Sequence, residues 1–238
     1  MVGLPMRKAA TSAARGIGST AGSALASRNA INWDNYNYPP LLHVVHFDLE
    51  ELDAVPRLIV RWCHWSYKLL VVCLFTNFVT NLVLAIGAVK LKYLHAVYAF
   101  FNLVIGTTVG FYVFFSGYKG VAIASSSMMH RYMALEAAII VLEFCFSILS
   151  VANFNGWTRV DQIDGAPTKE LKLYWLAAAF IESILWTIAY VIGCVALYHV
   201  VVLDRSGPMA FSGTRRAVKA LRETAMRPAQ EGVALERL

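Results

Sequence analysis

Four long apolar stretches constrain the fold of this chain more than any other feature. They run from about residue 69 to 89, 96 to 115, 132 to 151 and 173 to 203. Each reaches the ~20 residues that a helix needs to cross ~30 Å of hydrocarbon. Because backbone groups in lipid must be satisfied within each segment, we predict helices. The expected fold class is an all-α integral membrane protein, a bundle of four transmembrane helices.

The composition supports a membrane protein and argues against a nucleic-acid partner. Hydrophobic residues make up 58% of the chain and charged residues 15%, whereas soluble domains carry about 25% charged residues. The net charge of +6 is compatible with binding to nucleic acid. The Lys and Arg residues lie around the apolar spans, however, as topology control requires. We therefore expect the lipid bilayer as the main partner, other membrane subunits as further partners, and no nucleic acid.

The basic residues also predict an orientation. Sixteen of the 21 Lys and Arg residues lie in the two terminal segments and the second connection, and five lie in the first and third connections. Positive charge favours the cytoplasmic side. Both termini are therefore expected on the same side, the cytoplasm, or the matrix if the protein is mitochondrial.

The spans divide the chain into four parts. Residues 1–33 are a basic Ala-, Ser- and Gly-rich tail or targeting segment, and residues 34–68 are an aromatic and Pro-containing segment before the membrane. Residues 69–203 form the transmembrane domain, and residues 204–238 are a basic carboxyl tail. The acid-free first part fits an organellar transit peptide or a flexible tail beside an anionic membrane surface, and both interpretations stay open.

Three carboxylates fall within the predicted spans: Glu136, Glu143 and Glu182. Glu143 and Glu182 are each about ten residues from an end of their spans, which places both near the membrane midplane. No Lys or Arg is expected deep enough to pair with them. A charged group inside a membrane is costly, so these residues indicate a proton or cation path, or hydrogen-bonded carboxyls that hold helices together.

Small and basic residues predict two further contacts. Gly106 and Gly110 form a GxxxG pattern, which indicates close helix packing within the chain or in a dimer. Arg215, Arg216 and Lys219 alternate with apolar residues in the carboxyl tail. That tail is either an amphipathic helix on anionic lipid or a solvated segment.

The connections and the known motifs suggest no enzyme. The third connection, residues 153–172, is polar and is expected to be a solvated loop. The sequence contains no phosphate loop, dinucleotide fingerprint, zinc-protease motif or nucleophile elbow. No catalytic residue, cofactor or metal is therefore predicted.

The segment before the first span resembles a known family. Asn37-Tyr38-Pro39-Pro40, an apolar stretch with His and Asp at residues 41–49, and Pro56 are similar to the corresponding segment of secretory carrier membrane proteins (SCAMPs). Residues 111–119 and Gly156-Trp157 also resemble that family. The chain lacks an Asn-Pro-Phe motif, so binding to endocytic adaptor domains in the manner of the family is not expected.

The resemblance implies four spans, a tight first hairpin, cytoplasmic termini and a scaffold or lipid-interacting role in vesicle trafficking. It points to post-Golgi or endosomal vesicles or the plasma membrane. The residues that it suggests for membrane or partner contact are Tyr38, Pro39, Pro40, Tyr118 and Lys119. An alternative is an accessory structural subunit of a respiratory or ATP synthase complex in the mitochondrial inner membrane, which residues 1–33 favour. A third is a proton-coupled transporter that uses Glu143 and Glu182.

Overall fold

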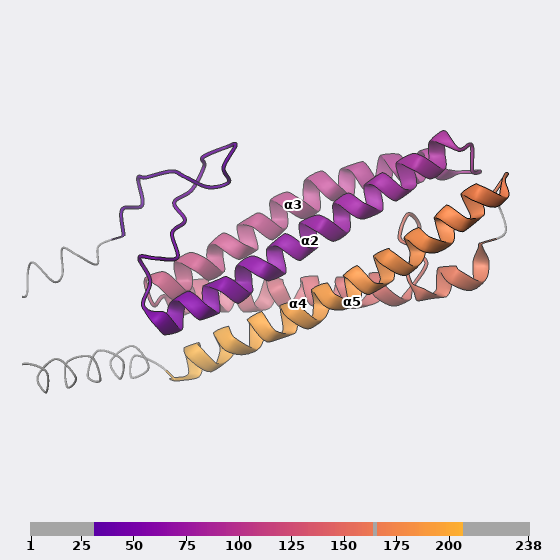
Figure 1. The fold of residues 1–238 in the computed structure, drawn as a ribbon. Helices are drawn as coiled ribbons and strands as arrows, with labels where there is room; N and C mark the ends of the chain where they lie inside the picture. The colour runs from indigo at the N-terminus through magenta and orange to yellow at the C-terminus, as the bar shows by residue number, and fades with distance from the viewer. Residues whose placement is uncertain (1–30, 164–165, 207–238) are drawn as a thin grey trace, which may run out of the picture. The chain divides into compact units, whose positions relative to one another are not determined.

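A computed structural model describes residues 31–163 and 166–206 of the 238-residue chain (Figure 1). The chain divides into two compact units, residues 1–53 and 54–238. The first 30 residues and the basic tail residues Arg215, Arg216 and Lys219 lie outside the described residues. The expectations for a targeting segment and for a membrane-bound tail therefore stay predictions.

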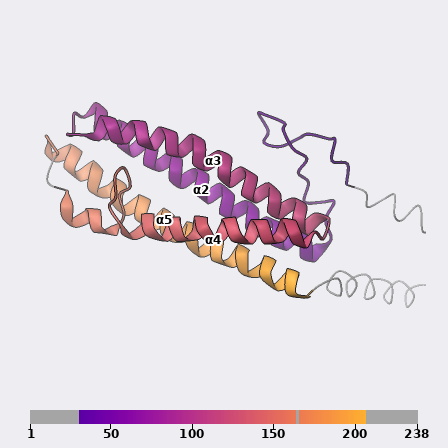
Figure 2. The same cartoon turned by 180° about the vertical axis from the view of Figure 1, so that it is seen from behind.

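The second unit is a bundle of four long helices. In chain order its elements are α2 (Ala54–Ile86), α3 (Lys92–Ala122), α4 (Ser126–Ile148), the short 3₁₀ helix η1 (Trp157–Gln162) and α5 (Lys169–Ser206). Helix α2 packs against α3 and α5, and α4 packs against the same two helices from the other side (Figures 1 and 2). The described residues contain no strand, which confirms the all-α prediction.

Three of these helices, α2, α3 and α5, are long and apolar enough to cross a membrane. Helix α4 is shorter, with 23 residues, and Arg131, Glu136 and Glu143 spread charge along its length. The beginning of α2 and the end of α5 lie at the same end of the bundle (Figure 1). A fourth span, and the side of the membrane that holds the termini, remain predictions.

Helix α2 begins fifteen residues before the apolar span that the sequence indicates, at Ala54 rather than near residue 69. Pro56 does not prevent this, because a proline in the first turn removes no hydrogen bond within the helix. With 33 residues, α2 is about 50 Å long at 1.5 Å per residue. The predicted pre-membrane segment, residues 34–68, is therefore a short folded segment followed by the first turns of α2.

The connection between α2 and α3 is short, as expected for a helical hairpin. Ala88 and Leu91 adopt left-handed backbone conformations, with φ of 57° and 65°. The Val89 amide donates to the Leu84 carbonyl at 3.1 Å. This turn reverses the chain within residues 87–91 and sets α3 alongside α2.

In the first unit, residues 37–47 form a hairpin. The amide of Val45 donates to the carbonyl of Tyr38, and the amide of Tyr38 donates to the carbonyl of Val45, both at 3.0 Å. The Asn37 side chain extends the pairing, because it donates to the Phe47 carbonyl and accepts from the Phe47 amide. Pro39 begins the turn, and the two adjacent prolines exclude a helix here.

Candidate functional site

The segment after α4 folds back into the helical bundle. Helix α4 ends at Ile148, and Asn153, Phe154 and Asn155 are all buried, with Asn155 fully inaccessible. This corrects the expectation that the third connection is solvated from residue 153 onward. The Asn155 side chain binds Glu182, which lies thirteen residues, or about 20 Å, inside α5 from its first residue. The segment therefore enters the bundle deeply rather than lying on its surface.

Gly156 permits this sharp return. A Cβ atom at this position would lie 2.6 Å from the carbonyl carbon of Ile148 and 2.6 Å from the carbonyl oxygen of Leu149. Both are backbone atoms at the end of α4, so neither can rotate away. The Phe154 ring then stacks on Phe146 with 3.7 Å between ring centroids. The close glycine contact and the ring stack together hold the segment against α4.

The buried segment is held by a set of polar side chains that we call the asparagine cluster. Its members are Asn77, Asn81, Asn102, Asn153, Asn155 and Glu182.

The carbonyl of Asn153 is the centre of this cluster. It accepts from Asn77 Nδ2 at 2.9 Å and from Asn81 Nδ2 at 2.8 Å, both on α2. The Asn153 side chain donates to Asn77 Oδ1 at 2.6 Å and accepts from Asn102 Nδ2 at 3.3 Å. Since buried polar groups are costly without partners, these bonds tie the segment to α2 and α3.

Asn155 connects the same segment to α5. Its Nδ2 donates to Glu182 Oε1 at 3.1 Å, and its Oδ1 accepts from Trp175 Nε1 at 3.0 Å. The Asn155 carbonyl accepts from Ser183 Oγ at 3.1 Å. Glu182 Oε2 accepts a further bond from Asn77 Nδ2 at 2.9 Å. Both carboxylate oxygens of Glu182 are thus bound by amide donors.

Lys92, at the first position of α3, brings a buried cation to the cluster. Its Nζ donates to Asn81 Oδ1 at 3.1 Å and lies 4.6 Å from the centre of the Trp175 ring. Arg159 approaches the same ring, with Cζ at 5.9 Å from its centre. Lys92 is linked to Glu182 only through Asn81 and Asn77, and the described residues show no direct ion pair between them.

The two other buried carboxylates, both on α4, have fewer partners. Glu136 accepts one bond, from Ser66 Oγ on α2 at 2.6 Å. Glu143 is 1% exposed, and within the described part of the chain neither of its oxygens has a hydrogen-bond partner. Among the described residues, Glu182 and Glu136 thus receive side-chain donors, whereas Glu143 receives none.

Glu143 and Glu182 do not lie at the same level of the bundle. Ser147 Oγ and Thr187 Oγ1 lie 2.7 Å apart and fix the level at which α4 and α5 meet. Because these helices run in opposite directions, Glu143 lies on one side of this level and Glu182 on the other. Glu143 is four residues from Ser147 and Glu182 is five residues from Thr187, and their placement near the membrane midplane stays a prediction.

The predicted glycine contacts lie between α2 and α3. A Cβ atom on Gly106 would lie 2.7 Å from Leu74 Cδ1, and one on Gly110 would lie 2.6 Å from Leu70 Cδ2. The GxxxG face is therefore covered by α2 of the same chain. Of the two interpretations, helix packing within the chain agrees with this geometry.

Two residues expected at a membrane or partner contact are placed differently from each other. Tyr118 is fully buried and stacks on Phe114. Its position corrects the expectation that it contacts the membrane surface or a partner, because no part of its side chain reaches the surface. Lys119 is partly exposed, and its Nζ lies 5.9 Å from the centre of the Phe115 ring. Its contact role stays a prediction.

The hairpin of the first unit contains an ionisable pair. His46 is buried, with Nε2 2.8 Å from Glu51 Oε2 and Nδ1 3.0 Å from the Asn35 carbonyl oxygen. Burial lowers the pKa of His46, but these two bonds and the charges of Glu51 and Asp48 raise it above its ordinary 6.5. Two acceptors face the two ring nitrogens, so the doubly protonated imidazolium fits the site. Tyr38 and Pro39 are partly exposed and Pro40 is exposed.

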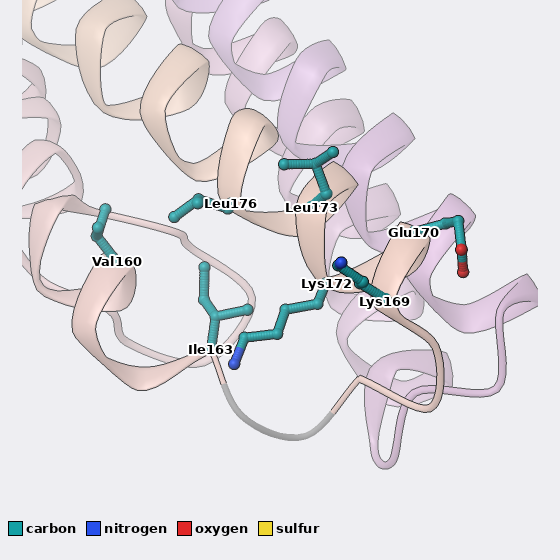
Figure 3. Close-up of a pocket in the computed structure, with 7 residues that line it drawn as sticks. All are labelled: Val160, Ile163, Lys169, Glu170, Lys172, Leu173 and Leu176. Carbon is teal, nitrogen blue, oxygen red and sulfur yellow. The ribbon is translucent and has the colours of Figure 1, made fainter.

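A pocket of about 530 Å³ lies beside the beginning of α5 (Figure 3), and none of the three buried carboxylates lines it. Its lining residues are Val160, Ile163, Lys169, Glu170, Lys172, Leu173 and Leu176. Apolar side chains dominate this lining, and the described residues contain no group of three or more His, Cys, Asp or Glu side chains placed to hold a metal.

The comparison with protein families gives a clear result. The model of the SCAMP family matches residues 35–207, which include the hairpin of the first unit and all four helices. The chain belongs to the SCAMP family. Neither a curated protein nor a solved structure was found to match it. The resemblance suggested by the Asn-Tyr-Pro-Pro block is thus confirmed, and the chain is an integral membrane protein of the SCAMP type.

For this SCAMP-family chain, sequence reasoning identified the three carboxylates but missed the groups that bind Glu182. A signal was present: Asn77 and Asn81 stand one helical turn apart inside an apolar span, and Asn153 and Asn155 follow the next-to-last span. Amides at such positions need internal partners.

The alternative of a mitochondrial accessory subunit rested on residues 1–33, and the family match does not favour it.

Proposed function

We propose that this chain is a non-enzymatic, four-span membrane protein that acts as a scaffold and lipid-interacting component in vesicle trafficking. The observation that supports this most strongly is the SCAMP family match, which extends from the hairpin through the last helix. Post-Golgi or endosomal vesicles and the plasma membrane are the proposed locations.

The charges support an orientation with both termini in the cytoplasm. All four helices carry basic residues at the end of the bundle that holds the start of α2 and the end of α5: Arg57, Arg61, Lys119, Arg131 and Arg205. Basic residues next to a span favour the cytoplasmic side and attract anionic lipid headgroups. Tyr38, Pro39, Pro40 and Lys119, with Arg215, Arg216 and Lys219 of the tail, are the proposed contacts with lipid or partner subunits.

Location tests the trafficking role. The full-length chain, tagged at its carboxyl end, is expected to fractionate with post-Golgi or endosomal vesicles or plasma membrane, and its removal is expected to slow the delivery of a secreted reporter. Fractionation with mitochondrial inner membrane, or unchanged delivery in its absence, would contradict the proposal.

A pair of cysteine variants tests the orientation. Leu41→Cys lies in the hairpin, where the side chain is 94% exposed, and Lys169→Cys lies at the end of the bundle opposite the start of α2 and the end of α5 (Figure 1). Exposed Cys194 is first replaced by Ser in both. In sealed vesicles with the cytoplasmic face outward, an impermeant maleimide should label Leu41→Cys directly and Lys169→Cys only after detergent. The reverse pattern would invert the proposed topology.

A further inference from the structure

The bundle interior holds one carboxylate that the fold itself does not satisfy. Glu182 is bound by Asn77 and Asn155, and Glu136 is bound by Ser66. Glu143 is buried, with 1% of its surface exposed, and no described residue donates a hydrogen bond to it. An ionised carboxylate without partners in an apolar interior is too costly to persist. Glu143 therefore requires a ligand that the other side chains do not supply.

The surroundings of Glu143 favour a proton over a metal cation. A sodium- or calcium-like ion requires several oxygen ligands in one shell. The two oxygens of Glu143 stand without a hydrogen-bonding neighbour, and no metal-holding cluster occurs within residues 31–163 and 166–206. A proton needs only one carboxylate oxygen. The chemistry of the site thus selects a proton.

Ionisable groups flank Glu143 toward both ends of the bundle. Glu136 lies seven residues earlier on α4, about 10 Å along the helix. On α5, Glu182 lies on the opposite side of the Ser147–Thr187 contact from Glu143. Along the bundle, the polar side chains therefore follow in the order Glu136 with Ser66, then Glu143, then Glu182 in the asparagine cluster.

A second orphaned polar atom belongs to the same part of the interior. Trp186 is fully buried, packs in one core cluster with Cys73, and its Nε1 has no hydrogen-bond partner within the described residues. Buried polar groups that lack protein partners are the usual binding places of internal water. Trp186 lies one residue before Thr187, at the level between Glu143 and Glu182, and its ring meets that of Phe146 on α4. Its Nε1 therefore offers internal water a polar partner between the two carboxylates.

We propose that Glu143 is the central proton-binding group of a hydrated path that carries protons between the two ends of the bundle, by way of Glu136 and Glu182. The transported species is the proton. It moves onto a carboxylate oxygen from a water on one side and leaves to a water on the other, so each carboxyl is restored after every passage. This activity is separate from the trafficking role.

Proton flux tests this proposal directly. The purified full-length chain is reconstituted in liposomes that contain a pH-sensitive dye, and a potassium diffusion potential drives proton entry. We expect faster acidification than in protein-free liposomes, and a decrease of about tenfold or more in Glu143→Gln, because an amide carries no acidic proton. Glu170→Gln, which changes an exposed glutamate at the start of α5, serves as the matched control and should leave the flux unchanged. A wild-type rate equal to that of empty liposomes, or an unchanged rate in Glu143→Gln, would overturn the proposal.

Chemical modification of the wild-type chain provides a test that does not depend on folding of a variant. A hydrophobic carbodiimide reacts with a protonated carboxyl in the membrane: the acid O–H adds across one N=C bond, and the adduct rearranges to a stable acylurea. Mass spectrometry should locate the adduct on Glu143, and flux should fall in proportion to its yield. Absence of the adduct from Glu143, or full flux in the modified protein, would contradict the proposed path.

Discussion

The asparagine cluster and Glu143 show two different uses of polarity inside one helical bundle. In the cluster, each amide is oriented by its neighbours, and Glu182 receives a donor on each oxygen. Glu143 receives none, although it is as deeply buried. A satisfied polar network fixes one geometry, whereas an unsatisfied group keeps its capacity to exchange a ligand. The first arrangement stabilises the fold, and the second is suited to function.

The largest effect is expected when the satisfied network loses its most connected member. Asn77→Leu keeps the approximate side-chain volume but removes three hydrogen bonds. The Asn153 side-chain amide loses its acceptor, and Glu182 Oε2 and the Asn153 carbonyl each lose a donor. Because each buried group left unpaired costs about 1–3 kcal/mol, we expect a loss of about 3 kcal/mol or more in the free energy of unfolding. Thermal and denaturant unfolding in detergent micelles measure this loss.

Glu143→Gln is the contrasting variant in the same assay. It removes no hydrogen bond that the described residues make, so its free energy of unfolding should stay within about 1 kcal/mol of the wild type. Equal losses in the two variants would remove the distinction between the two regions. A large loss in Glu143→Gln alone would reverse it.

The next effect concerns the backbone of the returning segment. In Gly156→Ala the added methyl group meets the backbone of Ile148 and Leu149 at 2.6 Å, so the segment must move away from α4. Overpacking of this kind costs about 1–3 kcal/mol. Gly193→Ala offers a milder comparison, because the nearest atom there is a side-chain carbon of Ile140 at 2.9 Å. Hydrogen exchange at residues 149–156 should increase more in the first variant than in the second.

These glycine and asparagine contacts also mark the limit of what the sequence predicts. Apolar length predicts the helices, because any span of ~20 apolar residues must satisfy its backbone as a helix in lipid. Length does not show that Asn153 and Asn155 turn inward, since a polar segment after a span has the composition of a solvated loop. Their burial depends on Asn77 and Asn81, which are 72 or more residues away. Contacts over such a separation leave no local periodicity.

For the three carboxylates, the sequence predicts burial but not hydrogen-bond partners. Their burial was predictable, because each lies in an apolar span. Their differences were not, since the number of donors depends on residues from α2 and from the returning segment. Tyr118 illustrates a related error: the family resemblance suggested it for membrane or partner contact, yet it is buried and its ring packs beside Phe114.

A smaller effect is expected at the edge of the cluster. Lys92→Met keeps the aliphatic part of the side chain but removes the ammonium group that donates to Asn81 and faces the Trp175 ring. One hydrogen bond to a charged group and one cation–π contact are together worth about 2 kcal/mol. Lys90→Met, two residues earlier and exposed, is the matched control. If both variants unfold at the wild-type denaturant concentration, Lys92 does not stabilise the cluster.

The smallest effect lies outside the bundle, where water weakens the interaction between His46 and Glu51. The pKa of His46 is raised in the folded hairpin above the 6.5 of the unfolded chain, so the folded state binds the proton more tightly. This contribution is complete below about pH 6.5 and is lost as the pH rises through the folded-state pKa. The side chain of Glu51 is 35% exposed, so we expect less than about 1 kcal/mol. Hydrogen exchange at the Val45 amide, corrected for the intrinsic pH dependence, should show protection that declines above this range.

Glu51→Gln should flatten the profile of protection against pH, since the amide retains an acceptor but not the charge. A profile that keeps its slope in Glu51→Gln would assign the effect to another group. Polar groups then differ by their surroundings: water weakens the His46–Glu51 pair, mutual hydrogen bonds fix the asparagine cluster, and Glu143 has no hydrogen-bond partner among the described residues.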